Sequence, residues 1–201
     1  MSASPPASLP FTGDPDADAL LAREPMALII GFVLDQQVSV QKAFSGPLEL
    51  QRRVGTIDAA AIAGMDPGDL DEAFRARPAL HRFPGNMAKR TQSLCAAVVE
   101  TYDGDVARVW TEAADGSDLE RRLLALPGIG AMKASTLVAI LVNRFGLDLP
   151  RIDEVMPSYP TLGDVESAEQ LARYQEMKRA YKQKLKAEGA TFDPKVAKAE
   201  G

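Results

Sequence analysis

The sequence holds a single cysteine among its 201 residues. One thiol can form neither an internal disulfide nor, from this chain alone, a zinc or iron-sulfur site built from several cysteines. Long apolar runs are also missing, because the longest, Met26 to Leu34, is far shorter than the roughly twenty residues that span a membrane. Residues 1–10 have no basic start followed by an apolar stretch. We therefore expect a cytoplasmic protein without disulfides that contacts no membrane.

Histidine is equally scarce, since His81 is the only one. Without a neighbouring cysteine or histidine it predicts a hydrogen bond in a loop and no metal site. We interpret Trp110 and Cys95 as packing residues.

Excess positive charge is absent too, because the formal net charge is -5. This excludes a strong field that steers nucleic acid toward the whole molecule. Residues 1–80 hold 11 acidic and 6 basic residues, whereas residues 171–188 carry six Lys or Arg and two Glu. A local basic face on the last helix is compatible with this distribution, either along DNA or as a solvated surface.

Apolar residues recur at helical spacing and none of the chain alternates with a period of two, which predicts an all-α fold. We interpret residues 1–15 as a flexible arm and residues 190–201 as a polar tail, both outside the core. Ser117 and Glu120 form the pattern of a capping box at the start of one helix. The predicted helices cover residues 25–34, 38–54 with a break near Gly46-Pro47, 56–64, 69–75, 86–102, 118–126, 131–145 and 168–187.

The most informative segment lies between two of these helices and reads Leu126-Pro127-Gly128-Ile129-Gly130-Ala131-Met132-Lys133-Ala134. Two glycines around an apolar residue allow a sharp turn and bring backbone amides close to an anion. The following helix start adds free amides and the positive end of its dipole. The segment therefore predicts a hairpin that holds a DNA phosphate, although an ordinary turn has the same glycine signals.

The chain resembles the helix-hairpin-helix (HhH-GPD) DNA glycosylase superfamily, which includes endonuclease III and the adenine and alkylbase glycosylases. It is most similar to a bacterial base-excision repair subgroup without an iron-sulfur cluster. The resemblance spans about residues 20 to 160 and rests on the hairpin together with the segments at residues 27–37, 83–90 and 150–153.

This resemblance implies two helical lobes with a cleft between them. Residues 38–144 would form the central lobe, which contains the helix-hairpin-helix at residues 118–145. Residues 16–37 and 146–189 would form the second lobe. Family enzymes extrude the target nucleotide into the cleft.

The resemblance also assigns chemistry. Bifunctional members use a lysine where this chain has Met132, which implies hydrolysis without strand cleavage. Lys133 lies about 100° further around the helix, so we interpret it as a phosphate contact or a solvated charge. Asp153 resembles the catalytic aspartate, although it lies 21 positions after Met132.

Asp148 and Glu154 remain alternatives to Asp153, as does a noncatalytic role for this aspartate. Gln37 either fills the gap left by the extruded nucleotide or caps the next helix. The residues expected to contact DNA are Gln37, Gly128, Ile129, Gly130, Ala131 and Lys133.

The sequence thus predicts a monomeric, monofunctional DNA glycosylase that acts on a damaged or mismatched base in double-stranded DNA. We expect no cofactor. Whether the hairpin carbonyls hold a monovalent cation stays open at this point. One alternative is a catalytically silent helix-hairpin-helix module that binds distorted DNA. Another is a helical protein with no role on DNA.

Overall fold

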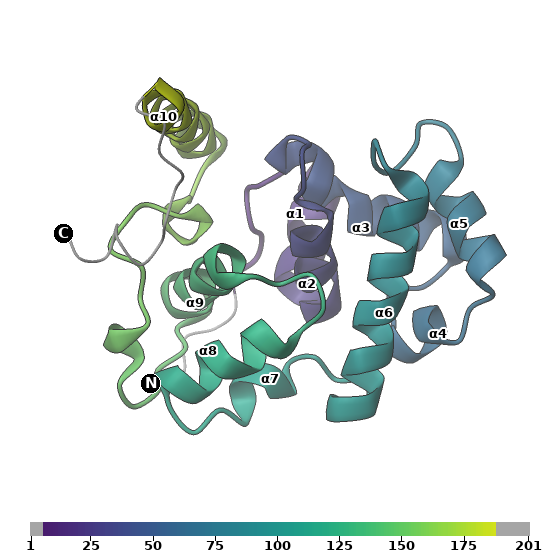
Figure 1. Ribbon diagram of the computed structural model, residues 1–201, viewed down its shortest axis with the longest axis horizontal. Helices are drawn as coiled ribbons and strands as arrows, with labels where there is room; N and C mark the ends of the chain where they lie inside the picture. Colours follow the sequence, from purple (N-terminus) through teal and green to yellow (C-terminus); the bar gives the residue numbers. More distant parts are fainter. Residues whose placement is uncertain (1–5, 188–201) are drawn as a thin grey trace.

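The computed structural model describes residues 6–187 and confirms the all-α prediction, because no strand occurs in that range. Figure 1 shows the ten α-helices and the loops between them. The elements are α1 Pro15–Arg23, α2 Pro25–Leu34, α3 Val40–Val54, α4 Ala59–Ala63, α5 Pro67–Arg75, α6 Pro84–Tyr102, α7 Arg108–Thr111, α8 Gly116–Ala125, α9 Ala131–Phe145, the 3-10 turns η1 Ile152–Glu154 and η2 Leu162–Asp164, and α10 Ala168–Ala187.

The α2 helix lies near the middle of the molecule, with α8 and α9 on one side and α4, α5 and α6 on the other (Figure 1). It is apolar nearly all round, and its residues from Met26 to Leu34 are all buried. The α2 helix packs on α3 and α6, while α9 packs on α8 and η2. Burial of α2 confirms the interpretation of its sequence, whereas the division into two lobes stays a prediction.

The expectation that residues 1–15 lie outside the core is wrong from Leu9 onward. Leu9 and Phe11 are fully buried, and the Phe11 ring lies 5.3 Å from that of Phe44, centroid to centroid. The Asp18 carboxylate accepts hydrogen bonds from the Phe11 and Thr12 amides and so fixes the segment. Two apolar residues without a helical period give no packing signal in the sequence. The polar tail predicted at residues 190–201 lies outside the described residues.

Two local predictions about helices also need correction. The N-cap of α8 is Asp115, whose side chain accepts from the Asp118 amide at 2.9 Å, so Ser117 forms no capping box. The predicted break near Gly46-Pro47 is absent, because α3 continues through Pro47. Gly46 packs tightly against α2, where a Cβ would lie 2.5 Å from the Leu34 side chain. That contact holds the helix in place across the missing proline N–H.

The α6 helix carries Cys95, which is completely buried, and burial raises the pKa of its thiol to about 12. Trp110 is partly buried against the same core. Both residues therefore pack as predicted. Within residues 6–187, no helix is long and apolar enough to cross a membrane.

Candidate nucleic-acid interface

The turn between α8 and α9 is a compact hairpin. Leu126 ends α8, and its carbonyl accepts a hydrogen bond from the Ile129 amide at 3.1 Å. Gly128 has φ +88°, a conformation that other residues adopt only with strain. Ile129 is buried in the core, and a Cβ on Gly128 would lie 3.2 Å from the Val33 side chain. The hairpin is therefore fixed against the end of α2.

The start of α9 presents unbound amides. Gly130 is its N-cap and has no side chain to accept from the first turn. The first hydrogen bond into the helix is from the Ala134 amide to the Gly130 carbonyl, which leaves the amides of residues 131–133 without a helical acceptor. Gly130 and Ala131 are exposed, and a Cβ on Gly130 would meet nothing within 4 Å. This geometry suits a phosphate, which binds to such amides without sequence readout.

Lys133 ties the hairpin to α2. Its ammonium donates to the Phe32 carbonyl at 2.6 Å and to the Gly128 carbonyl at 3.3 Å. Burial lowers the pKa of Lys133, while the charge of Asp35 acts in the opposite direction. A phosphate contact by Lys133 therefore stays a prediction, and in this structure the ammonium binds protein carbonyls. The monovalent cation on the hairpin carbonyls likewise stays a prediction.

The polar end of α2 lies beside the hairpin. The Gln36 side chain donates to the Val33 carbonyl at 3.0 Å and accepts from Arg90 of α6 at 3.1 Å. Gln37 is exposed and has φ +58°, a left-handed conformation that costs about 1–2 kcal/mol for a residue with a side chain. Asp103 and Arg151 have similar positive φ values, so the role of Gln37 at the DNA stays a prediction.

His81 connects the end of α2 with the start of α6. It is buried, its Nε2 donates to the Gln36 carbonyl at 2.9 Å, and its Nδ1 accepts from the Phe83 amide at 3.0 Å. Burial lowers the pKa of His81, which keeps the ring neutral with one donor and one acceptor. The structure thus confirms a loop hydrogen-bonding role. The two hydrogen bonds of His81 also fix Phe83 relative to α2.

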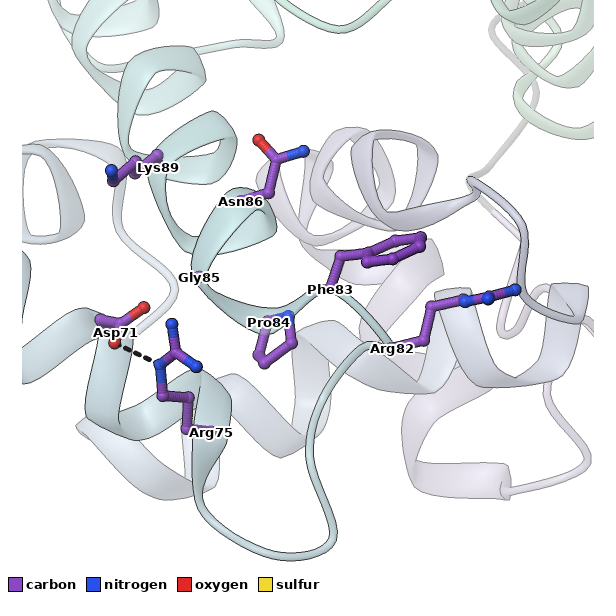
Figure 2. A pocket seen from close by; sticks show the side chains of 8 residues that line it. All are labelled: Asp71, Arg75, Arg82, Phe83, Pro84, Gly85, Asn86 and Lys89. Carbon is purple, nitrogen blue, oxygen red and sulfur yellow. Dashed lines mark hydrogen bonds and ion pairs between the residues drawn. The ribbon is translucent and has the colours of Figure 1, made fainter.

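A groove of about 630 Å³ opens at the start of α6. Figure 2 shows Phe83 and Arg82 on one side of it, the Asp71–Arg75 ion pair on the other, and Asn86 and Lys89 along α6. Phe83 is 42% exposed, and the Arg82 guanidinium lies 4.7 Å from its ring centroid. An exposed aromatic ring beside unpaired cations is a surface on which nucleic-acid bases and phosphates bind.

The structure does not bring Asp153 to the hairpin. The Gly116 amide donates to the Pro150 carbonyl at 2.9 Å, and a Cβ on Gly116 would lie 2.6 Å from the Arg151 carbonyl oxygen. Asp153, in η1, thus lies against the first turn of α8, whereas the hairpin follows the last turn. A ten-residue helix is about 15 Å long. Glu154 shares η1, and Asp148 follows the far end of α9, so neither alternative lies closer.

After η1, the next segment that approaches the start of α9 is the one that carries Tyr159. Tyr159 lies within hydrogen-bonding reach of the Ser135 side chain, and burial raises the pKa of Tyr159. Tyr174 of α10 is half-buried nearby, close enough to the end of α2 for the charge of Asp35 to act on it. Sequence reasoning assigned no role at the DNA to Tyr159, Tyr174 or Phe83. Phe83 opens the segment at residues 83–90, and Tyr174 lies at helical spacing on the apolar side of the last predicted helix, whereas Tyr159 carried no signal.

No group of three or more His, Cys, Asp and Glu side chains among residues 6–187 is placed to hold a metal ion. The family model described as "HhH-GPD superfamily base excision DNA repair protein" matches residues 30–191. Comparisons with curated proteins and with solved structures give no match.

Proposed function

Because the chain belongs to the HhH-GPD superfamily of base excision DNA repair proteins, we propose that it is a monofunctional DNA glycosylase. It hydrolyses the N-glycosidic bond of a damaged or mismatched base in duplex DNA and leaves the strand intact. The observation that carries this proposal is the hairpin, whose exposed amides at the start of α9 lie next to the polar end of α2.

The proposed DNA surface extends from the hairpin to the groove. Amides of residues 131–133 bind one phosphate, and Arg82 and Lys89 bind others. Arg90 and His81 both bind Gln36, and these hydrogen bonds connect the end of α2 with Phe83 and α6. Phe83 and Gln37 then face the duplex, where an exposed apolar side chain can separate base pairs and favour extrusion of a nucleotide.

Hydrolysis fits this chain better than Schiff-base chemistry. Met132 has no amine, and it occupies the position that the family resemblance gives to a nucleophilic lysine. The neighbouring amine of Lys133 is partly buried and bound to two carbonyls. An amine held in this way is not free to attack a sugar.

A catalytically silent DNA-binding module is the second candidate. The observation that favours it is the position of Asp148, Asp153 and Glu154, all of which lie beyond the ends of α8 and α9 that are distant from the hairpin. A binder needs the hairpin and the groove but no carboxylate beside the extruded sugar.

The first experiment separates these candidates. Purified protein is incubated with duplexes that contain uracil, an alkylpurine, an oxidised base or a mismatch, and released base is measured. We expect release from at least one duplex, with no strand cleavage and no adduct trapped by borohydride. If the protein binds these duplexes but releases base from none of them, the result would support the silent module. A trapped adduct would contradict the monofunctional assignment.

Gly130→Ala tests the hairpin itself. A methyl group at this position meets no protein atom within 4 Å and φ is -98°, so the free energy of unfolding should change by less than about 0.5 kcal/mol. The same methyl group would occupy part of the open space at the N-cap of α9, where we propose that a phosphate binds, and should lower the affinity for duplex DNA at least about tenfold. Unchanged affinity in electrophoretic-mobility or anisotropy assays would remove the hairpin from the DNA surface.

A further inference from the structure

Asp35 ends α2 directly beside the hairpin. Its amide donates to the Gly31 carbonyl at 3.0 Å and to the Phe32 carbonyl at 3.3 Å. The Phe32 carbonyl also accepts the Lys133 ammonium at 2.6 Å. The backbone of Asp35 and the ammonium of Lys133 therefore share one acceptor, which places Asp35 at the start of α9.

The fold itself makes little use of this carboxylate. Asp35 is half-buried, and within residues 6–187 no hydrogen bond or ion pair engages its side-chain oxygens. It also stands at the C-terminal end of a helix, where the negative end of the dipole disfavours an acidic side chain. The described structure therefore gives no hydrogen-bonding role to the Asp35 side chain.

The charge of Asp35 acts on groups from two other helices. Its charge raises the pKa of Lys133 of α9, against the larger effect of burial, and it contributes to the pKa of about 12 at Tyr174 of α10, for which burial is the main cause. Arg90 of α6 also acts on Lys133 and so lies in the same neighbourhood. Asp35 thus lies close enough to the start of α9 and to α10 for its charge to act on both helices.

We propose that Asp35 is the catalytic carboxylate, which stabilises the positive charge that develops on the sugar as the base departs. This inference rests on the proposed glycosylase function and replaces Asp153 in that role. The distance argument supports it, because Asp153 lies about one length of α8 from the hairpin, whereas Asp35 shares a backbone acceptor with Lys133.

The step balances without a cofactor. The bond between the sugar C1′ and the base nitrogen breaks, and the base leaves with the electron pair and takes a proton from solvent. A water molecule forms the new bond to C1′ and passes its proton to the Asp35 carboxylate, which returns it to solvent. The ionised carboxylate is most useful while the sugar is positively charged.

The test uses two duplexes of the same sequence as probes. One contains a neutral tetrahydrofuran abasic site, and the other contains a cationic pyrrolidine at the same position. We expect the protein to bind the cationic duplex at least about tenfold more tightly than the neutral one. Asp35→Asn should bring this ratio close to one without weakening binding to the neutral duplex. The matched control Asp153→Asn should keep the ratio.

A second measurement distinguishes a variant that misfolds from one that folds but no longer catalyses base release. Asp35→Asn should unfold at about the same temperature as the unchanged protein, because no hydrogen bond or ion pair within residues 6–187 engages the Asp35 side-chain oxygens. It should slow base release at least about 100-fold on any duplex that the unchanged protein processes.

Two results would overturn the assignment of Asp35: an unchanged protein with no preference for the cationic duplex, or Asp35→Asn with the preference intact. Failure of the glycosylase proposal has a different signature, namely no base release from any duplex by the unchanged protein.

Discussion

At the scale of single residues, His81 holds together two segments that form the proposed DNA surface. The ring donates to the Gln36 carbonyl and accepts from the Phe83 amide, so it needs exactly one proton. A second proton on the ring would remove the acceptor for the Phe83 amide. The folded structure therefore requires a neutral His81 imidazole.

This requirement predicts a dependence of stability on pH. The pKa of His81 in the folded state is lower than that of a free imidazole, so as pH falls the unfolded chain takes up its proton first. The stabilisation is complete above about pH 6.5 and is lost as pH falls below that value toward the folded-state pKa. Urea unfolding at pH 7.5, 6.5 and 5.5 should show the decrease.

His81→Gln provides the control, because its stability should vary less over the same pH range. The imidazole can also be followed directly by NMR, since the chain has no other histidine. An imidazole that titrates at or above pH 6.5 in the folded protein would contradict the prediction.

Some site residues could be predicted from sequence and others could not. The hairpin glycines were predictable, because φ +88° at Gly128 and an open N-cap at Gly130 are local requirements. The inward direction of Lys133 was not, since its acceptor at Phe32 lies 101 positions earlier in the chain. Similarly, the proposed role of Asp35 could not be predicted, because it depends on neighbours on α9 and α10 that are distant in the sequence.

At the scale of elements, α8 determines how the hairpin is presented. The Asp115 side chain accepts from the Asp118 amide, and the Asp118 carboxylate accepts from the Ala114 amide and from Arg122. These contacts lower the pKa of Asp118 to about 2, with the Ala114 hydrogen bond as the largest cause. The cap therefore lies two residues earlier than the Ser117 and Glu120 pattern predicts.

A pair of substitutions distinguishes the two caps. Asp115→Ala should lower the free energy of unfolding by about 1 kcal/mol, because the Asp118 amide loses its acceptor. Ser117→Ala should have an effect within about 0.5 kcal/mol, since Ser117 is exposed. Chemical denaturation of both variants measures the difference. Equal losses would show that both side chains cap the helix.

The α6 and α9 helices were predictable because their apolar faces repeat every three to four residues, and α2 was predictable because it begins at Pro25 and is apolar nearly all round. The four-residue α7 and the whole of α1 were not predicted, since they are too short or too polar to show a period. The path between α9 and α10 was also unpredictable from pattern alone. Its course past α8 depends on Gly116, which leaves room for the Arg151 carbonyl.

At the scale of the whole molecule, charge sets the limits of DNA binding. The net charge of -5 repels a polyanion, so affinity must come from a few local contacts. The hairpin amides are neutral, whereas Arg82, Lys89 and Arg90 are exposed cations. Arg75 forms an ion pair with Asp71 and therefore adds little to the attraction of DNA.

This distribution predicts a shallow dependence of binding on salt. If the three exposed cations each neutralise one phosphate, a plot of log affinity against log salt concentration should have a slope of about -3. Lys89→Gln should reduce the slope by about one, while Gly130→Ala should lower affinity and leave the slope unchanged. Anisotropy titrations at several salt concentrations give these values. A slope near -8 would require a basic surface outside these three residues.

The burial of Cys95 has a practical consequence for such experiments. Because this thiol is fully buried and its pKa is about 12, maleimide dyes should not label the folded protein at neutral pH. A cysteine introduced at exposed Ala131 would then be the single reactive position, and a fluorophore attached there would report the arrival of DNA at the hairpin in real time.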